Sequence, residues 1–533
     1  MVNFAIEPRN ATNTPQRPLV PLLVVGLALT ASLAGCGGSP ESPANAGPRP
    51  NPPGDVAANR RESQPRPSAP PSTAPPRQDP SPRVPRQDVS PPAQADVPPG
   101  DRPAAADQPP PRSLGDLLEG PIDMPRLPVD EQKAARLGIR KLSGKHLTLY
   151  TDLPAGAEIE SLPRVFDLAA PQWCEYFEID PAKIDGWRIT GFVMGDKEKF
   201  REAGLLPDYL PEFRHGFAYG MEVWVNEQPS DYYRRHLLLH EGTHAFMQHQ
   251  LGAVGPPWYA EGMAELLATH RWRDGKLTLS TMPRDKKETP DWGRIKIIRD
   301  GFAAKRALTL EKVMAYGPQA HLETEPYGWC WGVAAMLDGT PSYRPAFRDM
   351  RKHVKLGGDV FNRRLREALG EQWERAIEQW QLFAAEAEYG YDLARAEVTR
   401  APSAPLTGAA TSTVKADRGW QSSGVRVEAG RTYRLTASGR FQVGDQPKPW
   451  WCEPNGVTIE YYADRPLGML LCAVRDDEQL LTGKSPLLDG RSVGLGGDVV
   501  FPTSGTLYFR INESPAALSD NQGELSVRIE AAP

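Results

Sequence analysis

The stretch 240–244, with the sequence HEGTH, constrains this chain more than any other, and it lies inside a run, 235–248, that predicts a helix. Histidines four residues apart project from one helical face, so both imidazoles can reach a single ion. The glutamate after the first histidine can then address a water molecule beside that ion. The stretch therefore predicts a zinc hydrolase centre. The alternative is a helix whose histidines are only solvated or hydrogen-bonded.

A catalytic zinc needs a third protein ligand and an open position for water. The chain breaks at Gly252 and then resumes as a second predicted helix, 258–267, antiparallel to the first. Glu261 lies in the first turn of this helix and can face the histidine pair. A metzincin would need glycine and histidine where this chain has Met247 and Gln250, so that class is excluded.

The segments HEGTH and WYAEGMAE, at 240–244 and 258–265, resemble those of the gluzincins, the peptidase MA-like branch of the zinc metallopeptidases. The resemblance is strong over 217–268 and looser over 146–395. It implies a gluzincin-like α+β peptidase domain, which we assign to 113–400, and a peptide or protein substrate.

The resemblance also implies roles for individual residues. It makes His240, His244 and Glu261 the zinc ligands, with Glu241 as the general base. The same family pattern has two further counterparts in this chain, Glu265 and Tyr327. Glu265 would orient a ligand histidine, with a solvated helix carboxylate as the alternative. Tyr327 would stabilise the oxyanion, with an aromatic helix face buried in the core as the alternative.

The rest of this domain predicts alternating strands and helices. Strands are expected at 146–151, 187–194 and 216–226, a helix at 159–177, a hairpin-like stretch at 277–287 and a helical region at 310–398. By the gluzincin resemblance, the strand at 216–226 borders the cleft and offers its edge to a peptide. Simple packing is the alternative interpretation.

The beginning of the chain predicts export and anchoring. Arg9 and Arg17 precede an apolar run, 19–33, that is too short to span a bilayer. The following Ala-Gly-Cys resembles the end of a bacterial lipobox, which implies cleavage before Cys36 and lipidation of that cysteine. The segment 1–36 is therefore interpreted as a lipoprotein signal peptide, with a plain signal peptide as the alternative. The protein would then face the periplasm or the cell surface.

The segment 37–112 has almost no large apolar residues and is rich in proline, alanine, serine and arginine. Such a composition cannot bury enough surface to fold, so we expect a disordered tether. A proline-rich ligand for a partner is the alternative.

Beyond a predicted linker at 401–414 the hydrophobic pattern changes to strand periodicity. Short strands are expected at 424–428, 432–439, 506–511 and 525–529, which favours an antiparallel β-sandwich over 415–533. The whole chain is therefore expected to be multidomain.

This C-terminal region resembles the calcium-dependent galactophilic lectins of the PA-I type, through GWQSSG at 419–424 and the segments 510–515 and 521–527. The resemblance implies a calcium ion held by Glu513, Asp520 and Asn521, and glycans as partners. The family's sugar-contacting segment is replaced here by 461–469, which leaves the sugar specificity open. The alternative is a sandwich that only stabilises the peptidase.

Four cysteines remain after Cys36. Cys452 and Cys472 lie in the same small β domain and can pair, because an exported protein permits disulfides. Cys174 and Cys330 lie among aromatic residues in predicted helices and are expected to be buried, with a bridge left open.

The net charge of -5 and the lack of a basic patch give no nucleic-acid signal. The sequence thus predicts a lipid-anchored exported zinc peptidase with a lectin-like β domain. The competing hypothesis is a surface carbohydrate-binding lipoprotein whose peptidase-like domain is inactive.

Overall fold

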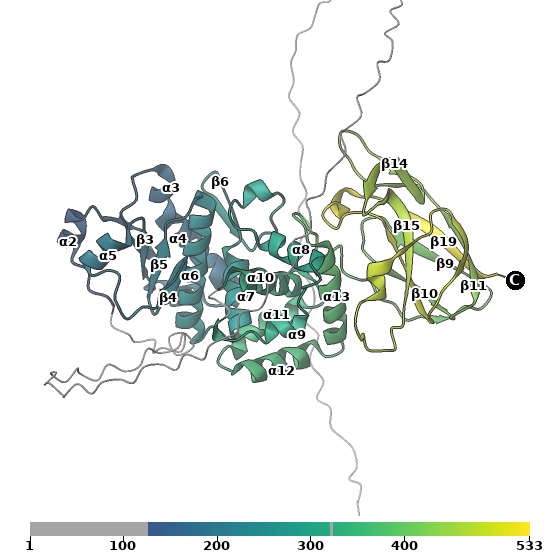
Figure 1. Ribbon diagram of the computed structural model, residues 1–533, viewed down its shortest axis with the longest axis horizontal. Coiled ribbons are helices and arrows are strands. Elements are labelled where there is room, and N and C mark those ends of the chain that lie inside the picture. Colours follow the sequence, from purple (N-terminus) through teal and green to yellow (C-terminus); the bar gives the residue numbers. More distant parts are fainter. Residues whose placement is uncertain (1–125, 320–322, 533) are drawn as a thin grey trace, which may run out of the picture. The chain divides into compact units, whose positions relative to one another are not determined.

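The computed structural model of the protein describes residues 126–319 and 323–532. They form a mixed α/β domain followed by a β domain, and Figure 1 shows the helices in the first and most strands in the second. The predicted signal peptide with Cys36 and the predicted tether lie outside the described residues. No helix of the described ranges is both long and apolar enough to cross a membrane.

The α/β domain contains an open five-stranded sheet in the order β1-β2-β3-β5-β4. Its strands are β1 (Arg140–Ser143), β2 (Leu147–Thr151), β3 (Ile189–Met194), β4 (Gly216–Tyr219) and β5 (Glu222–Asn226). The three inner strands are parallel, whereas β1 and β4 pair antiparallel at the two edges. The strands predicted at 146–151 and 187–194 are confirmed as β2 and β3.

The prediction of one continuous strand at 216–226 is wrong, because the chain turns back in its middle. Gly220 has a φ of 59°, in the left-handed region that glycine adopts without steric cost. The two halves form the antiparallel hairpin β4–β5. As a result β4, which begins at Gly216, is an edge strand of the sheet.

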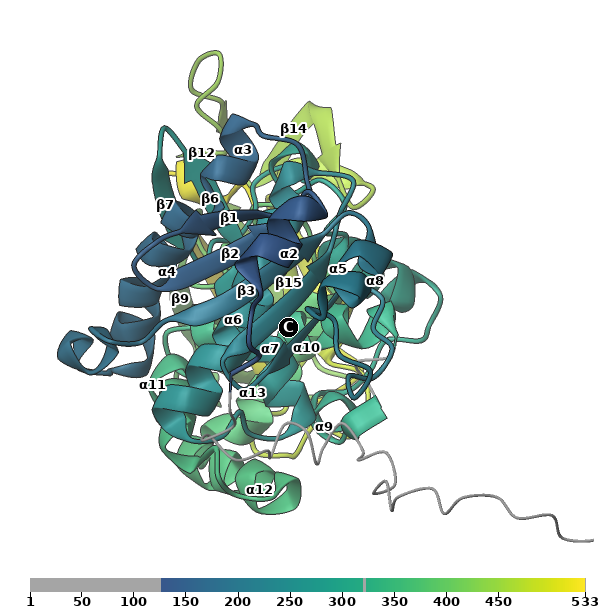
Figure 2. The ribbon, with the colours of Figure 1, turned by 90° about the vertical axis from the view of Figure 1, so that its left-hand side faces the viewer.

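Side chains alternate between the two faces of this sheet, as the pleat requires. Val223 and Val225 of β5 belong to the large core that β4 and β5 share with α6 (Asp231–Leu251) and that also includes α4 (Leu162–Phe177). Trp224 points the other way, into a smaller core with residues of α2 (Glu131–Arg136) and α5 (Lys197–Ala203). Figure 2 looks onto the sheet from the side of α2 and α5.

The helices after the sheet build most of the large core. They are α7 (Pro257–Ala268), α8 (Arg294–Ala303), α9 (Leu310–Met314), α10 (Thr324–Gly339), α11 (Arg344–Asp349), α12 (Gly358–Leu369) and α13 (Gln372–Glu386). The helix predicted at 159–177 is found as α3 (Ala157–Glu160) and α4. The helical region predicted over 310–398 ends earlier, with α13. The predicted hairpin at 277–287 is also displaced, since β6 (His270–Arg273) pairs with β7 (Lys276–Leu279).

The β domain has two larger open sheets with a shared hydrophobic core. One contains β8 (Ala404–Pro405), β10 (Gln421–Val427), β14 (Asn455–Tyr462), β15 (Arg465–Arg475), β16 (Arg491–Ser492) and β18 (Gly505–Ile511). The other contains β9 (Ala409–Lys415), β11 (Thr432–Ser438), β17 (Gly496–Val500) and β19 (Glu524–Ala531). A short pair, β12 (Phe441–Gln442) and β13 (Trp451–Cys452), forms a separate two-stranded sheet. The four strands predicted in this region are found as β10, β11, β18 and β19.

The predicted linker at 401–414 is largely part of this domain. β9 begins at Ala409 and pairs with β19 over its whole length, and β8 pairs with β10. Only Val414 and Ser412 of β9 are buried, because β9 is an edge strand with one covered face. Its small polar residues read as a linker in the sequence, yet the backbone bonds to β19 hold it as a strand.

Candidate metal centre and cavity

Helix α6 places three histidines on one face. Its first turn is capped by Ser230, whose hydroxyl accepts a hydrogen bond from the backbone N–H of Tyr233. His236, His240 and His244 follow at steps of four residues, and all three are buried. One of them, His236, precedes the HEGTH motif by one turn and was not singled out in the sequence.

Three of the predicted ligand atoms converge between α6 and α7. The Nε2 atoms of His240 and His244 are 3.2 Å apart, and Glu261 Oε2 lies 3.2 Å from the first and 3.6 Å from the second. The three ligand atoms lie within 4.8 Å of one another. Apart from the two imidazoles, Glu261 Oε2 has no polar partner among the described residues, although it is buried. Two imidazole nitrogens and a carboxylate oxygen without another donor fit the ligand set of zinc.

The charge state of Glu261 is consistent with a role as a metal ligand. Burial alone would raise the pKa of Glu261, but His244 and His240 outweigh it and hold the pKa below its usual range. The carboxyl is therefore ionised, which a metal ligand must be.

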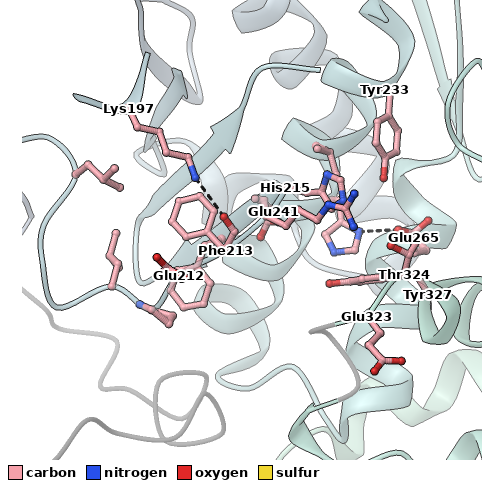
Figure 3. A pocket seen from close by; sticks show the side chains of 18 of the residues that line it. Lys197, Glu212, Phe213, His215, Tyr233, Glu241, Glu265, Glu323, Thr324 and Tyr327 are labelled. Carbon is pink, nitrogen blue, oxygen red and sulfur yellow. Dashed lines mark hydrogen bonds and ion pairs between the residues drawn. The ribbon is translucent and has the colours of Figure 1, made fainter. Parts of the chain in front are cut away.

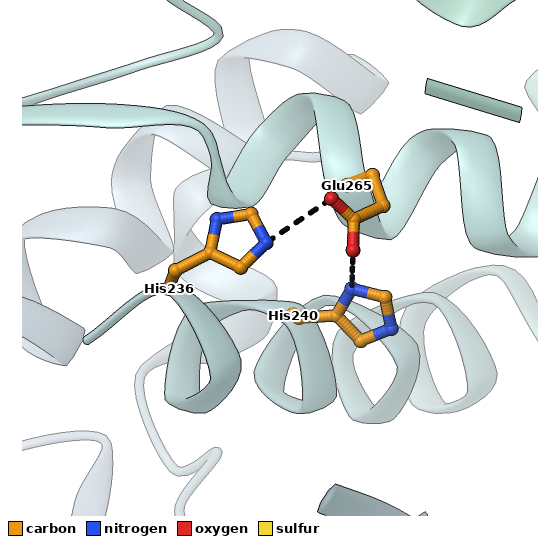
Figure 4. A group of neighbouring side chains, drawn as sticks. All are labelled: His236, His240 and Glu265. Atoms are coloured by element: carbon orange, nitrogen blue, oxygen red, sulfur yellow. Dashed lines mark hydrogen bonds and ion pairs between the residues drawn. The ribbon is translucent and has the colours of Figure 1, made fainter. Parts of the chain in front are cut away.

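Glu265 holds the opposite side of His240 (Figure 4). Its Oε1 lies 3.3 Å from His240 Nδ1, and its Oε2 lies 3.1 Å from His236 Nε2. The contact places a carboxylate beside the ring, and a proton on His240 Nδ1 would leave Nε2 to act as a ligand. The geometry is the one expected for a residue that orients a ligand histidine, and Glu265 is fully buried rather than solvated.

Arg294 of α8 completes this group, and no local sequence motif contains it. Its Nε and one terminal nitrogen donate to the two oxygens of Glu265 at 2.9 and 2.8 Å. Burial alone would raise the pKa of Glu265, but Arg294 and His236 keep it well below its usual range. His236, His240 and Glu265 could also hold a metal ion. The guanidinium already neutralises that carboxylate, which favours a positioning role over a second cation.

The catalytic residues predicted beside the metal face one cavity of about 620 Å³ (Figure 3). Glu241, His240 and Tyr327 line it together with Gly216 of the edge strand β4. Burial raises the pKa of Glu241 above its ordinary value, against the opposing effect of His240 and His244. The cavity therefore brings a carboxyl with a raised proton affinity next to the ligand cluster, as a general base requires.

The ring of Tyr327 lies edge-on to His240, with 5.7 Å between the ring centroids, and the guanidinium of Arg294 lies 5.5 Å from its centroid. Burial, with the nearby carboxylates of Glu261 and Glu241, raises the pKa of Tyr327 well above its ordinary value. Its hydroxyl is therefore protonated at neutral pH and can donate a hydrogen bond. The side chain is half-buried at the cavity wall rather than inside the core.

His215 is a further cavity residue that the sequence analysis missed. It precedes β4, and burial, followed by Arg214 and Arg294, lowers its pKa. A neutral imidazole thus lines the wall next to Gly216. Neither His215 nor Arg294 belongs to a local motif, so only the fold reveals them.

The predicted calcium residues lie in the segment between β18 and β19. Glu513 Oε2, Asp520 Oδ1 and Asn521 Oδ1 are buried, and none of the three has a hydrogen-bond partner among the described residues. Burial, with Asp520 as a lesser cause, raises the pKa of Glu513 to about 8. Buried oxygens without donors are costly unless a cation or water satisfies them, and oxygen ligands are those that calcium prefers.

The cysteines of the described residues are all unpaired. Cys174, Cys330, Cys452 and Cys472 are buried thiols. The pairing considered for Cys452 and Cys472 is therefore not found. Burial raises the pKa of each of these two thiols to about 12, so they behave as small apolar side chains.

Comparisons with known proteins assign no family to this chain. No protein-family model matches the chain. No curated protein matches it either. Among solved structures, the chain is similar to one described as "EclA N-terminal domain; PllA-like lectin", at 20% sequence identity and a TM-score of 0.18. That alignment covers 23% of this chain and 95% of the lectin chain.

Proposed function

We propose that the protein is an exported, membrane-anchored zinc peptidase of the gluzincin type, which hydrolyses peptide bonds in peptides or proteins. The observation that carries the proposal is the convergence of His240, His244 and Glu261, next to a cavity that His240 and Glu241 line. The anchor rests on the lipobox resemblance at Cys36.

Each residue of the site has a separate role in the proposed reaction. Zinc held by His240, His244 and Glu261 would supply Lewis acidity toward the scissile carbonyl and make a water molecule more acidic. Glu241 takes a proton from the attacking water and passes it to the leaving amine. The hydroxyl of Tyr327 donates a hydrogen bond to the developing oxyanion. Glu265, held by Arg294, keeps the ring of His240 in place.

A second candidate function is carbohydrate binding by the β domain, with a peptidase-like domain that no longer turns over. The observation that favours it is the group of three buried oxygens on Glu513, Asp520 and Asn521, which lack donors. Both domains can function in one protein, so only turnover separates an active peptidase from an inactive one.

The test compares two carboxylates with different roles. Glu241→Gln should keep about one zinc per chain and reduce cleavage of a peptide library at least about a hundredfold, the scale of a lost general base. Glu261→Ala should instead weaken zinc binding, with activity partly restored by excess zinc. The matched control is Glu175→Gln, the same chemical change at an exposed position of α4, which should leave both zinc content and cleavage unchanged.

Metal analysis and mass spectrometry of the digests measure these outcomes. A wild-type protein that holds zinc and cleaves nothing in a broad library would remove the peptidase proposal and leave the binding-protein alternative. Normal zinc content in Glu261→Ala would show that Glu261 is not the third ligand.

A further inference from the structure

The carboxylate of Glu241 lies directly against the backbone of the edge strand β4. A Cβ atom placed on Gly216 would come within 2.5 Å of Glu241 Oε1, 2.9 Å of its Cγ and 3.0 Å of its Cδ. Side-chain carbon atoms do not approach other heavy atoms this closely without displacement. Glu241 in its observed position is therefore compatible only with glycine at 216.

The backbone conformation does not explain this glycine. Gly216 does not have a positive φ, unlike Gly220 at the turn of the same hairpin. It pairs with Val225 in a regular antiparallel register, where any L-residue can adopt the backbone angles. The requirement at 216 is for space, and the group that occupies the space is the carboxylate of Glu241.

The contact joins two elements that approach the cavity from different parts of the chain. Helix α6 carries Glu241 and packs against β4, and both residues line the cavity next to His240. Other buried side chains of α6, including Leu239, fix the helix in the large core. A side chain on β4 would consequently move the free end of Glu241 and leave the helix in place.

We propose that Gly216 is a positioning residue: it provides the slot that lets Glu241 lie against β4 at the distance the reaction requires. This inference rests on the proposed peptidase function. An ordinary contact of 3.4 Å in place of 2.5 Å requires a movement of about 0.9 Å. Displacements of about 1 Å at a reacting group can reduce turnover about a hundredfold.

The test is Gly216→Ala in two backgrounds. In the wild-type background it should lower kcat about a hundredfold, with zinc content unchanged, because no metal ligand is displaced. The second background is Glu241→Ala, which removes the Cγ, Cδ and Oε1 atoms that the new methyl group would meet. There Gly216→Ala should change the residual kcat by less than about a factor of two, the limit expected for sites that do not interact.

The control is Gly186→Ala, the same substitution at a position with no atom within 4 Å of the new Cβ and no positive φ. It should leave kcat and zinc content unchanged. An equal loss of kcat from Gly216→Ala in both backgrounds would overturn the proposal, since the methyl group would then act on the strand or the substrate instead of Glu241.

A second measurement does not depend on turnover. If Gly216→Ala lowers the melting temperature through its contact with Glu241, the loss should disappear in the Gly216→Ala/Glu241→Ala variant relative to Glu241→Ala alone. If Gly216→Ala lowers the melting temperature by the same amount in the Glu241→Ala background, the proposed contact is contradicted. Failure of the peptidase function itself is separate, because it would show as a wild-type protein without turnover while this stability comparison still holds.

Discussion

The pair formed by Arg294 and Glu265 offers the sharpest test of how the candidate metal centre is held together. Both side chains are buried, at 2% and 0% exposure, and two hydrogen bonds join them. Arg294→Met keeps much of the side-chain volume but leaves Glu265 without its guanidinium. Removal of one partner from a buried ion pair costs about 3–5 kcal/mol, which is a large part of the stability of a typical domain.

The assay is equilibrium urea unfolding of the chelator-treated full chain, so that the result reports the protein alone. Arg294→Met should reduce the free energy of unfolding by about 3–5 kcal/mol near neutral pH. In Arg294→Met/Glu265→Gln the loss should be smaller than the sum of the single losses by about 0.5–3 kcal/mol, because no unpaired carboxylate remains. Arg299→Met, at an exposed position of the same helix, serves as the control and should change the value by less than about 0.5 kcal/mol.

The pH dependence has a definite sign. In the wild type the pKa of Glu265 is depressed on folding, so its contribution to stability is present above the ordinary value of 4.5 and is lost as the pH falls further. Without Arg294 the pKa of Glu265 rises, and the carboxyl can take up a proton more readily. The deficit of Arg294→Met should therefore shrink as the pH falls toward 4.5. Strictly additive losses, or a deficit that does not change with pH, would refute the assignment of Arg294 as the counter-charge of Glu265.

Two further predictions concern the other sites. The pKa of Glu513, about 8, is raised on folding, so without calcium its contribution to stability is present below 4.5 and is lost as the pH rises through about 8. Calcium needs the ionised carboxylate and should therefore raise the melting temperature of the full chain more above pH 8 than near pH 6, and the same increase in Asp520→Ala would place calcium elsewhere. Cys36→Ser should release the protein from membranes or block its processing, whereas unchanged membrane retention together with an unchanged mature mass would reject the lipid anchor.

Local patterns in the sequence predicted the helices of the candidate site well. The run 235–248 lies inside α6, and the predicted helix 258–267 lies inside α7. The histidines of α6 and the glutamates of α7 recur at steps of four residues. Helix geometry places residues at this spacing on one face, regardless of the rest of the fold. His236 lies four residues before His240, so the same spacing rule also places it on the face of the motif.

The features that the sequence did not predict have a common physical cause: each depends on contacts between residues far apart in the chain. The stretch 216–226 is rich in residues favoured in strands, and the turn at Gly220 depends on one backbone angle. β9 is a strand only because β19 lies beside it. Arg294 lies more than fifty positions after Glu241 in the printed sequence, and its role depends on how α8 packs. Such partners follow from tertiary structure and leave no local trace.

The contacts between α6 and α7 explain why one end of the histidine row is suited to a metal and the other is not. Along α6 the order is His236, His240, His244, while the carboxylates that face these histidines are Glu265 first and Glu261 second. The opposite order of the two rows shows that the helices run antiparallel in this register, as the sequence predicts. A shift by one turn, about 5.4 Å, would give both carboxylates different partners.

Within this register, His240 lies between the two glutamates and offers a different nitrogen to each. Its Nδ1 faces Glu265, whose charge Arg294 already balances at 2.8 and 2.9 Å. Its Nε2 faces Glu261, which pairs with no cationic side chain of the described residues other than the histidines beside it. The carboxylate without a guanidinium partner and the Nε2 atoms of two histidines thus coincide at one end of the row. A single cation between His240, His244 and Glu261 would satisfy all three groups, and the position of Arg294 favours that place over one a turn earlier.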